Sequence, residues 1–161
     1  MGLFRCAAYL AAAGATSFVL GRALPSAWLR EPRGIFRCFP FEREGRLYDR
    51  IGVKRWQGKL PDMSRILPGF LPPKRIGPTG GDLSEMVRET CVAELCHWAL
   101  CAAGVACLWL WPGAGGIAVF AAYAAGNAPF ILAQRCNRPR LVRLEEKRRA
   151  RWGGGREGVL S

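Results

Sequence analysis

The sequence predicts an all-α integral membrane protein, in which a two-helix transmembrane hairpin is joined by a third, N-terminal span. Two observations predict this fold. Residues 91–134 contain no Lys or Arg and a single acid, although the 161-residue chain has 24 Lys and Arg in total. A shorter apolar run lies near the N-terminus. Nearly all of the charge thus lies outside the apolar runs, as is typical of multi-pass membrane proteins.

The N-terminal apolar run, residues 6–22, is expected to be a membrane span. A cleaved signal peptide is the alternative, because a basic flank before an apolar stretch rich in small residues is typical of one. Removal of that segment would leave both basic regions of the chain outside the cell, contrary to the positive-inside bias. A retained span with the N-terminus outside is therefore favoured.

The region that follows, residues 25–90, is basic and rich in Pro and Gly, and is expected to form an irregular cytoplasmic or interfacial segment. Over residues 41–56 aromatic and aliphatic side chains alternate with basic ones, which suits contact with an anionic membrane face. A solvated basic loop is the alternative. Asp82 is expected to cap a new helix, with Glu85 at the third helical position.

The hairpin is predicted from two apolar runs, residues 91–111 and 114–134. About 20 residues at ~1.5 Å each span a hydrocarbon core of ~30 Å. Pro112 and Gly113 separate the runs and provide a tight turn. A buried hairpin in a soluble helical protein is the alternative, but it would need polar faces that these runs lack.

The last segment, residues 135–161, is expected to be a basic cytoplasmic tail whose short helix frays at Gly153. The whole chain, residues 1–161, is therefore predicted to be a single membrane domain in the cell membrane. Its C-terminus is expected in the cytoplasm.

Composition excludes several classes of site. The single histidine rules out sites that need two or more imidazoles, such as zinc fingers, and no metal site is expected. The seven cysteines are odd in number and form no CxxC pair, so they are expected to be buried hydrophobes, not a disulfide framework. The formal net charge of +12 indicates an anionic partner, but the uncharged stretch argues against a soluble nucleic-acid binder.

The presence of ionisable residues inside the first hairpin helix requires an explanation, since an ionisable group at a helix centre costs about 3 kcal/mol in a bilayer. Thr90, Glu94, His97 and Cys101 fall on one stripe of this helix. His97 could serve as a general base, with Glu94 near enough to bias its tautomer. The structural alternatives are a hydrogen bond from His97 across the bundle and a neutral Glu94 between the helices.

The second hairpin helix has a matching polar stripe, which contains Tyr123, Asn127, Gln134 and Arg138. Counted from the turn at about 1.5 Å per residue, His97 and Asn127 both lie roughly 20 Å from it. The sequence therefore predicts one polar site in the cytoplasmic half of the membrane, although Asn127 could instead serve helix packing.

Three sequence segments carry specific motifs: FPFEREGRLYDRIGVKRWQGKLPD over residues 39–62, ETCVAELCHW over 89–98 and NAPFILAQRCNRPRLVRL over 127–144. In this order they resemble the patterns FE-x-x-G…W…KLP, ET-x-x-AEL-x-HW and N-x-P-x(4)-QR-x-NRPR. These are signatures of the glycosyl-4,4'-diaponeurosporenoate acyltransferase family, membrane enzymes of staphyloxanthin-type carotenoid biosynthesis. Cys136 stands where the family has an aromatic residue, and residues 61–81 have no counterpart.

The resemblance implies transfer of a fatty acyl group from acyl-CoA or acyl carrier protein to a sugar hydroxyl of a glycolipid, such as a glycosylated carotenoid. The residues that match the hairpin patterns are Glu89, Thr90, Glu94, His97 and Trp98 on the first helix, and Asn127, Pro129, Gln134, Arg135, Asn137, Arg138, Pro139 and Arg140 on the second. No bound cofactor is implied, and the expected partners are membrane lipid, the glycolipid and the acyl carrier protein.

On this resemblance His97 is the expected base and Glu94 its orienting carboxylate. Asn127 and Gln134 are candidate donors to the oxyanion or the acceptor hydroxyl, and the other residues expected at the substrate site are Glu89, Thr90 and Trp98. The residues expected to bind donor phosphates or an acidic carrier are Arg135, Asn137, Arg138 and Arg140. A purely positive-inside anchor is the alternative for these arginines.

A different class of function also fits the pattern. A small non-enzymatic hairpin could bind anionic lipid or assist a glycolipid-synthesis complex, and three spans could form a homo-oligomer that encloses a lipid. Since no Ser or Cys is placed as an acyl-enzyme nucleophile, the enzymatic interpretation favours direct transfer in a ternary complex.

Overall fold

The computed structural model describes residues 1–25, 28–29, 32–61 and 83–157. The elements in these ranges are α1 (Gly2–Ala23), η1 (Gly34–Phe36), η2 (Pro40–Gly45), α2 (Arg46–Arg50), α3 (Val53–Trp56), η3 (Gln57–Lys59), α5 (Leu83–Gly104), α6 (Cys107–Leu110) and α7 (Ala114–Glu157). All are helical, and the described ranges contain no strand. The predicted all-α class is confirmed.

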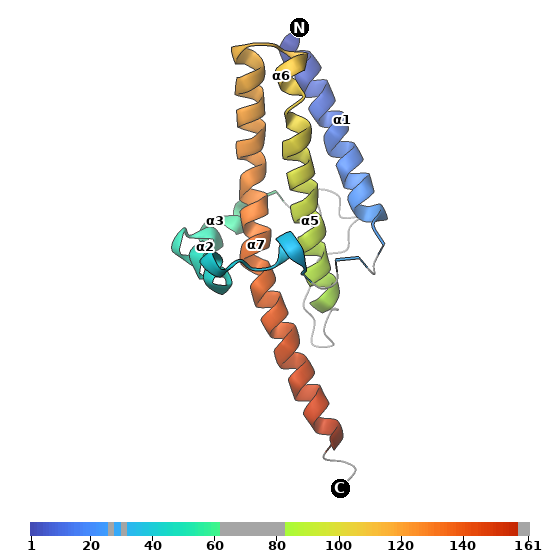
Figure 1. Cartoon of the computed structure of the whole chain (residues 1–161), viewed down its shortest axis with the longest axis vertical. Helices are drawn as coiled ribbons and strands as arrows, with labels where there is room; N and C mark the ends of the chain where they lie inside the picture. Colours follow the sequence, from blue (N-terminus) through green and yellow to red (C-terminus); the bar gives the residue numbers. More distant parts are fainter. Residues whose placement is uncertain (26–27, 30–31, 62–82, 158–161) are drawn as a thin grey trace.

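Three helical stretches are long and apolar enough to cross a membrane: Gly2–Ala23, Leu83–Leu110 and Ala114–Arg151. They stand side by side in Figure 1, with the N-terminus and the turn before α7 at the same end. Large apolar side chains of α1, among them Phe4 and Val19, are exposed. Such exposure suits contact with lipid hydrocarbon, and the N-terminal helix is, like the two hairpin stretches, long and apolar enough to span a membrane, as predicted.

The first hairpin helix begins before its predicted start but is broken after Gly104, where the short helix α6 continues it, and the second extends past its predicted end. Helix α5 begins at Leu83, and the expected cap at Asp82 lies outside the described residues. Helix α7 runs without interruption for 44 residues and ends at Glu157, past the fraying predicted at Gly153. At the usual rise it is about 66 Å long, twice a hydrocarbon core, so its second half projects beyond the bundle (Figure 1). Leu, Glu, Lys, Arg and Ala after Pro139 favour helix and explain the continuation.

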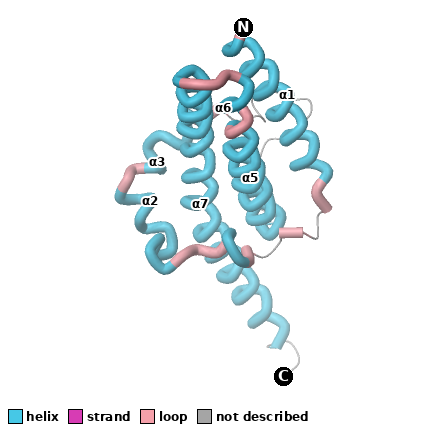
Figure 2. Tube along the Cα trace, turned by 45° about the horizontal axis from the view of Figure 1, so that its top comes forward, coloured by secondary structure: helices cyan, strands magenta, loops and turns pink. Residues whose placement is uncertain are grey.

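Part of the region expected to be irregular is ordered. The short helices between residues 34 and 59 pack against α7, as Figure 2 shows. Tyr48, Val53 and Cys136 form a small buried cluster there, with Trp56 and Leu132 beside it. These interleaved apolar side chains therefore face α7, which local periodicity could not reveal.

The cysteines are all free, and four are buried: Cys6, Cys91, Cys107 and Cys136. They match the prediction of small buried hydrophobes. Cys38 differs, because it is exposed on the segment before η2. Partial desolvation of the thiol and the neighbouring charge of Glu42 raise the pKa of Cys38.

The hairpin turn depends on glycine because Trp111 and the backbone around it lie very close. A Cβ built on Gly115 would lie 2.2 Å from the Trp111 ring, and one on Gly116 would lie 2.2 Å from the Trp111 carbonyl oxygen. A backbone oxygen cannot move aside as the end of a flexible side chain can. Gly116 is therefore required for the close approach of α6 and α7.

Replacement of Gly116 by Ala is expected to lower the free energy of unfolding by about 1–3 kcal/mol, because the added methyl group overpacks the turn. Thermal unfolding in detergent, followed by circular dichroism, measures the effect. Gly126→Ala is the matched control, since a Cβ there meets nothing within 4 Å. The control should be neutral or stabilising through helix propensity, and equal melting temperatures for the two variants would contradict the packing argument.

Candidate active site

His97 on α5 and Asn127 on α7 face each other inside the hairpin. The distance between His97 Nδ1 and Asn127 Oδ1 is 2.8 Å. Asn127 is 7% exposed and His97 is half-buried. The contact confirms that the two residues lie at the same depth, as the count from the turn predicts.

The hydrogen bonds of Asn127 fix the tautomer of His97. Asn127 Nδ2 donates to the carbonyl oxygen of Tyr123, 2.9 Å away, which leaves Oδ1 to face the imidazole. Since Oδ1 can only accept, His97 Nδ1 must hold the proton and donate it. In the neutral ring, Nε2 therefore keeps its lone pair, and within the described residues it has no hydrogen-bond partner.

The ring plane of His97 is set by a third residue. The Phe130 ring stacks on the imidazole, with 4.7 Å between the ring centroids and 13° between the planes. Phe130 follows Asn127 by three residues on α7, so both contacts come from one helical turn. Two contacts thus orient the His97 ring: the hydrogen bond at Nδ1 and the stacking of Phe130 on its face.

Glu94 lies one turn nearer the N-terminal end of α5 and pairs with arginines, not with His97. Its two carboxylate oxygens accept from Arg135 Nη1 at 2.7 Å and from Arg138 Nη2 at 2.5 Å. Trp98 Nε1 also donates to Glu94, at 3.3 Å. The side chain that contacts His97 Nδ1 is therefore Asn127 and not Glu94, because two guanidinium groups bind a carboxylate more strongly than a neutral imidazole does.

Arg135 joins Glu94 to a second buried carboxylate, Glu42. Arg135 Nε donates to Glu42 Oε1 at 2.6 Å and Nη2 donates to Oε2 at 3.0 Å. Both carboxylates are only 1% exposed. Arg135 also donates to the backbone oxygens of Ile35 and Arg37, so it fastens the segment before η2 to the hairpin.

The contacts around Glu42 shift the pKa of Glu42 and the pKa of Tyr48. Burial alone would raise the pKa of Glu42, but hydrogen bonds from Arg135, Tyr48 and the Phe39 N–H outweigh it and lower that pKa. The Tyr48 hydroxyl donates a hydrogen bond to the Glu42 carboxylate. Burial and this bond raise the pKa of Tyr48 well above its ordinary value. Glu42 is therefore ionised and Tyr48 neutral at physiological pH.

Arg138 is held as completely as Arg135. Its guanidinium donates to Thr90 Oγ1 at 3.0 Å, to the Thr90 carbonyl at 2.9 Å and to the Phe36 carbonyl at 2.9 Å, besides Glu94. The side chain is 3% exposed. Arg140 pairs instead with Asp49 on α2. Arg135 and Arg138, expected to bind donor phosphates, thus have their donors engaged by the protein itself.

The remaining predicted residues are spread around this centre. Gln134 and Asn137 are half-buried, and their side chains make no hydrogen bond within the described part of the chain. Glu89 is half-buried, and Trp98 is 51% exposed. Groups of three His, Cys, Asp or Glu able to hold a metal ion do not occur among the described residues.

Glu42 and Tyr48 are the members of this site that the sequence-based assignment missed. Glu42 belongs to the FE-x-x-G string, which matches the family pattern without indicating a role for this residue. That string was the available signal, but nothing in its spacing places Glu42 beside Arg135, which is 93 residues away along the chain.

Comparison with known proteins identifies the family. The profile of the glycosyl-4,4'-diaponeurosporenoate acyltransferase family matches residues 32–147, a range that contains both carboxylates, His97 and Asn127. Proteins of that name from Staphylococcus aureus strains bovine RF122 / ET3-1 and USA300 are each 31% identical to this chain over 128 residues. The aligned region covers 78% of this chain and 76% of each relative. No solved structure matches the chain. The chain therefore belongs to the glycosyl-4,4'-diaponeurosporenoate acyltransferase family.

Proposed function

We propose that this protein transfers a fatty acyl group from an acyl thioester, acyl-CoA or acyl carrier protein, to a sugar hydroxyl of a membrane glycolipid. Its relatives are named for a glycosylated diaponeurosporenoate, so a glycosylated carotenoid is the first acceptor to test. The single observation that supports the chemistry best is the His97–Asn127 pair, which leaves His97 Nε2 free to accept a proton.

In the proposed reaction, His97 Nε2 removes the proton of the sugar hydroxyl while that oxygen attacks the thioester carbonyl. The tetrahedral intermediate then collapses, the carbon–sulfur bond breaks, and the leaving thiolate takes the proton back from Nε2. Asn127 Oδ1 accepts a hydrogen bond from Nδ1–H throughout and so stabilises the transient imidazolium. The ester and the free thiol are the two products, and no covalent acyl-enzyme is needed.

The other polar residues have supporting roles in this proposal. One N–H of the Asn127 amide is used by Tyr123, which leaves the second to donate to the oxyanion, together with Gln134. Glu94 holds Arg135 and Arg138 one turn below His97 and so fixes the floor of the site. The neighbouring residues Glu89, Thr90 and Trp98 are proposed to line the substrate site.

The proposed orientation places the N-terminus outside and both basic segments in the cytoplasm. Cys38 tests this, because it is the one exposed cysteine and lies outside the spanning helices. A membrane-impermeant maleimide should label Cys38 in inside-out vesicles and leave it unlabelled in intact cells. Cys38→Ser is the control for label at the other six cysteines. Labelling in intact cells would reverse the orientation.

The enzymatic function is tested with the purified protein in liposomes that contain a glycosylated carotenoid. Addition of a long-chain acyl-CoA or acyl carrier protein should produce a lipid heavier by one acyl group and an equal amount of free thiol. A folded, reconstituted protein that yields neither product with either donor would contradict the proposal and favour a non-enzymatic lipid-binding hairpin.

A further inference from the structure

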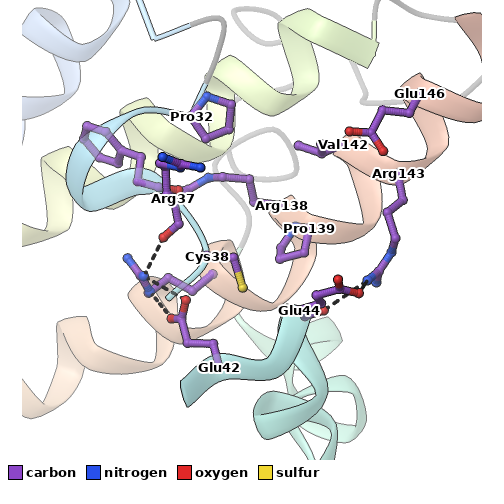
Figure 3. A pocket seen from close by; sticks show the side chains of 12 residues that line it. Pro32, Arg37, Cys38, Glu42, Glu44, Arg138, Pro139, Val142, Arg143 and Glu146 are labelled. Carbon is purple, nitrogen blue, oxygen red and sulfur yellow. Dashed lines mark hydrogen bonds and ion pairs between the residues drawn. The ribbon is translucent and has the colours of Figure 1, made fainter. Parts of the chain in front are cut away.

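A pocket opens where the segment before η2 meets the second half of α7. Its volume is about 440 Å³, and its lining includes Arg37, Cys38, Arg138 and Arg143 (Figure 3). Its lining also includes Glu42 and Arg135 of the buried carboxylate network. None of its exposed residues has a role in the proton transfer at His97.

The charge around this pocket favours an anionic ligand. Residues 32–61 and 135–151 together contain sixteen Lys and Arg against five Asp and Glu. Within the pocket, Glu42 and Glu44 are already paired with Arg135 and Arg143, and Glu146 is the remaining acid. A concave site inside so basic a surface concentrates anions.

Two arginines of the pocket are available to such a ligand. Arg37 is exposed, and its guanidinium has no partner among the described residues. Arg143 is paired with Glu44 at 3.0 Å, but the two side chains are 44% and 75% exposed. A pair this exposed contributes little, so Arg143 can exchange the carboxylate for a phosphate. Arg135 and Arg138, by contrast, are committed to buried partners.

The distance from this pocket to His97 matches one kind of donor. Asn127 and Arg138 are eleven positions apart on α7, about 16 Å at the usual helical rise. The phosphopantetheine arm of an acyl thioester has thirteen bonds between phosphorus and sulfur. At the ~3.3–3.6 Å that three bonds of extended chain cover, the arm reaches about 15 Å. The length of the arm is thus close to the distance between His97 and the Arg138 end of the pocket, and Arg143, five positions further along α7, would have to reach a phosphate there with an extended side chain.

We propose that this pocket binds the phosphate of the donor's phosphopantetheine arm, with Arg37 and Arg143 as its charged contacts. The inference rests on the proposed acyl transfer, and it moves the phosphate site away from Arg135 and Arg138. A phospholipid headgroup offers the same phosphate chemistry, so the experiment must distinguish the two sources.

The test uses the full protein in nanodiscs of zwitterionic phosphatidylcholine, with Cys38 as reporter because it lines the pocket. Acetyl-CoA should slow the alkylation of Cys38 by a charged maleimide. S-acetyl-4'-phosphopantetheine, which keeps the phosphate of the arm and lacks the nucleotide, should also slow it, whereas S-acetylpantetheine, which lacks every phosphate, should not. The R37Q/R143Q double variant should need about tenfold more acetyl-CoA for half protection, because two charge-assisted contacts are lost. Arg46→Gln, an equal loss of charge at an exposed site outside the pocket, should leave the concentration unchanged.

The outcomes separate this inference from the proposed function. Protection by acetyl-CoA without any acyl transfer would support the pocket and count against the enzyme. Acyl transfer without protection of Cys38, or equal protection in the R37Q/R143Q variant, would overturn the pocket alone. Protection by phosphatidylglycerol that acetyl-CoA cannot displace would identify a lipid headgroup site and overturn the assignment to the donor.

Discussion

His97→Gln is expected to lower the turnover number for acyl transfer by about 10²- to 10⁴-fold, the usual contribution of a general base. The Gln amide can still donate to Asn127 Oδ1, so the contact between the two helices survives. It has no basic lone pair, however, and cannot take the proton of the sugar hydroxyl. The measurement is the initial rate in liposomes at saturating donor and acceptor.

Two features of the result would separate catalysis from structure. The Michaelis constants should change little, because the substituted atom acts in the transition state. Cys101→Ala, on the same stripe of α5 one turn further along, should keep the wild-type rate. A His97→Gln protein that is present in the membrane at its usual level and turns over normally would exclude His97 as the base.

Glu94→Gln is expected to lower the free energy of unfolding by about 3–5 kcal/mol, the usual effect of breaking a buried ion pair. The carboxylate is 1% exposed and pairs with both Arg135 and Arg138. Its loss leaves two buried guanidinium groups with Glu42 as the remaining buried carboxylate among the described residues. Thermal or denaturant unfolding in detergent measures the change.

The matched control is Glu145→Gln on the projecting part of α7. Glu145 pairs with Arg149, whose side chain is 74% exposed, so its loss should change stability by less than about 1 kcal/mol. A cycle with Arg138→Gln adds a second test, because residues in direct contact should couple by about 0.5–3 kcal/mol. Additive effects of Glu94→Gln and Arg138→Gln would contradict the network.

The His97–Asn127 contact was predictable because it depends on two local features, the rise of each helix per residue and the short turn between the two helices. The rise of a helix is nearly constant, and a tight turn puts equal numbers of residues on either side at equal depth. The stripe on α5 follows from helical periodicity in the same way. The family signatures point to the same two helices independently.

The partner of Glu94 was less predictable because several groups compete for it. His97 lies three residues away on the same helix, whereas Arg135 and Arg138 reach Glu94 from α7. Sequence spacing predicts that Glu94 and His97 are neighbours, but it does not predict the contacts of Glu94 with the two arginines. The charge of the arginines decides the outcome, since an ionised carboxylate in a low-dielectric setting takes the strongest donors that it can reach.

The position of Glu42 depends on how its segment packs against α7, and no local sequence pattern predicts that packing. The segment from Gly34 to Lys59 is held to α7 through Tyr48, Val53 and Cys136, and through the bonds of Arg135. Gly45 and Gly52, with φ of 91° and 71°, let the chain change direction between its short helices. Short helices broken in this way give little periodicity, so the sequence alone predicts an irregular segment there.

We expect His97, oriented by Asn127, to catalyse acyl transfer to a membrane glycolipid. The most direct test of this role is lipid mass spectrometry of cells that make a glycosylated carotenoid and express the wild type, His97→Gln or Cys101→Ala at equal levels. A glycolipid heavier by one fatty acyl group should appear with the wild type and Cys101→Ala, and be lost with His97→Gln. Its accumulation to the same level in all three strains would contradict the claim.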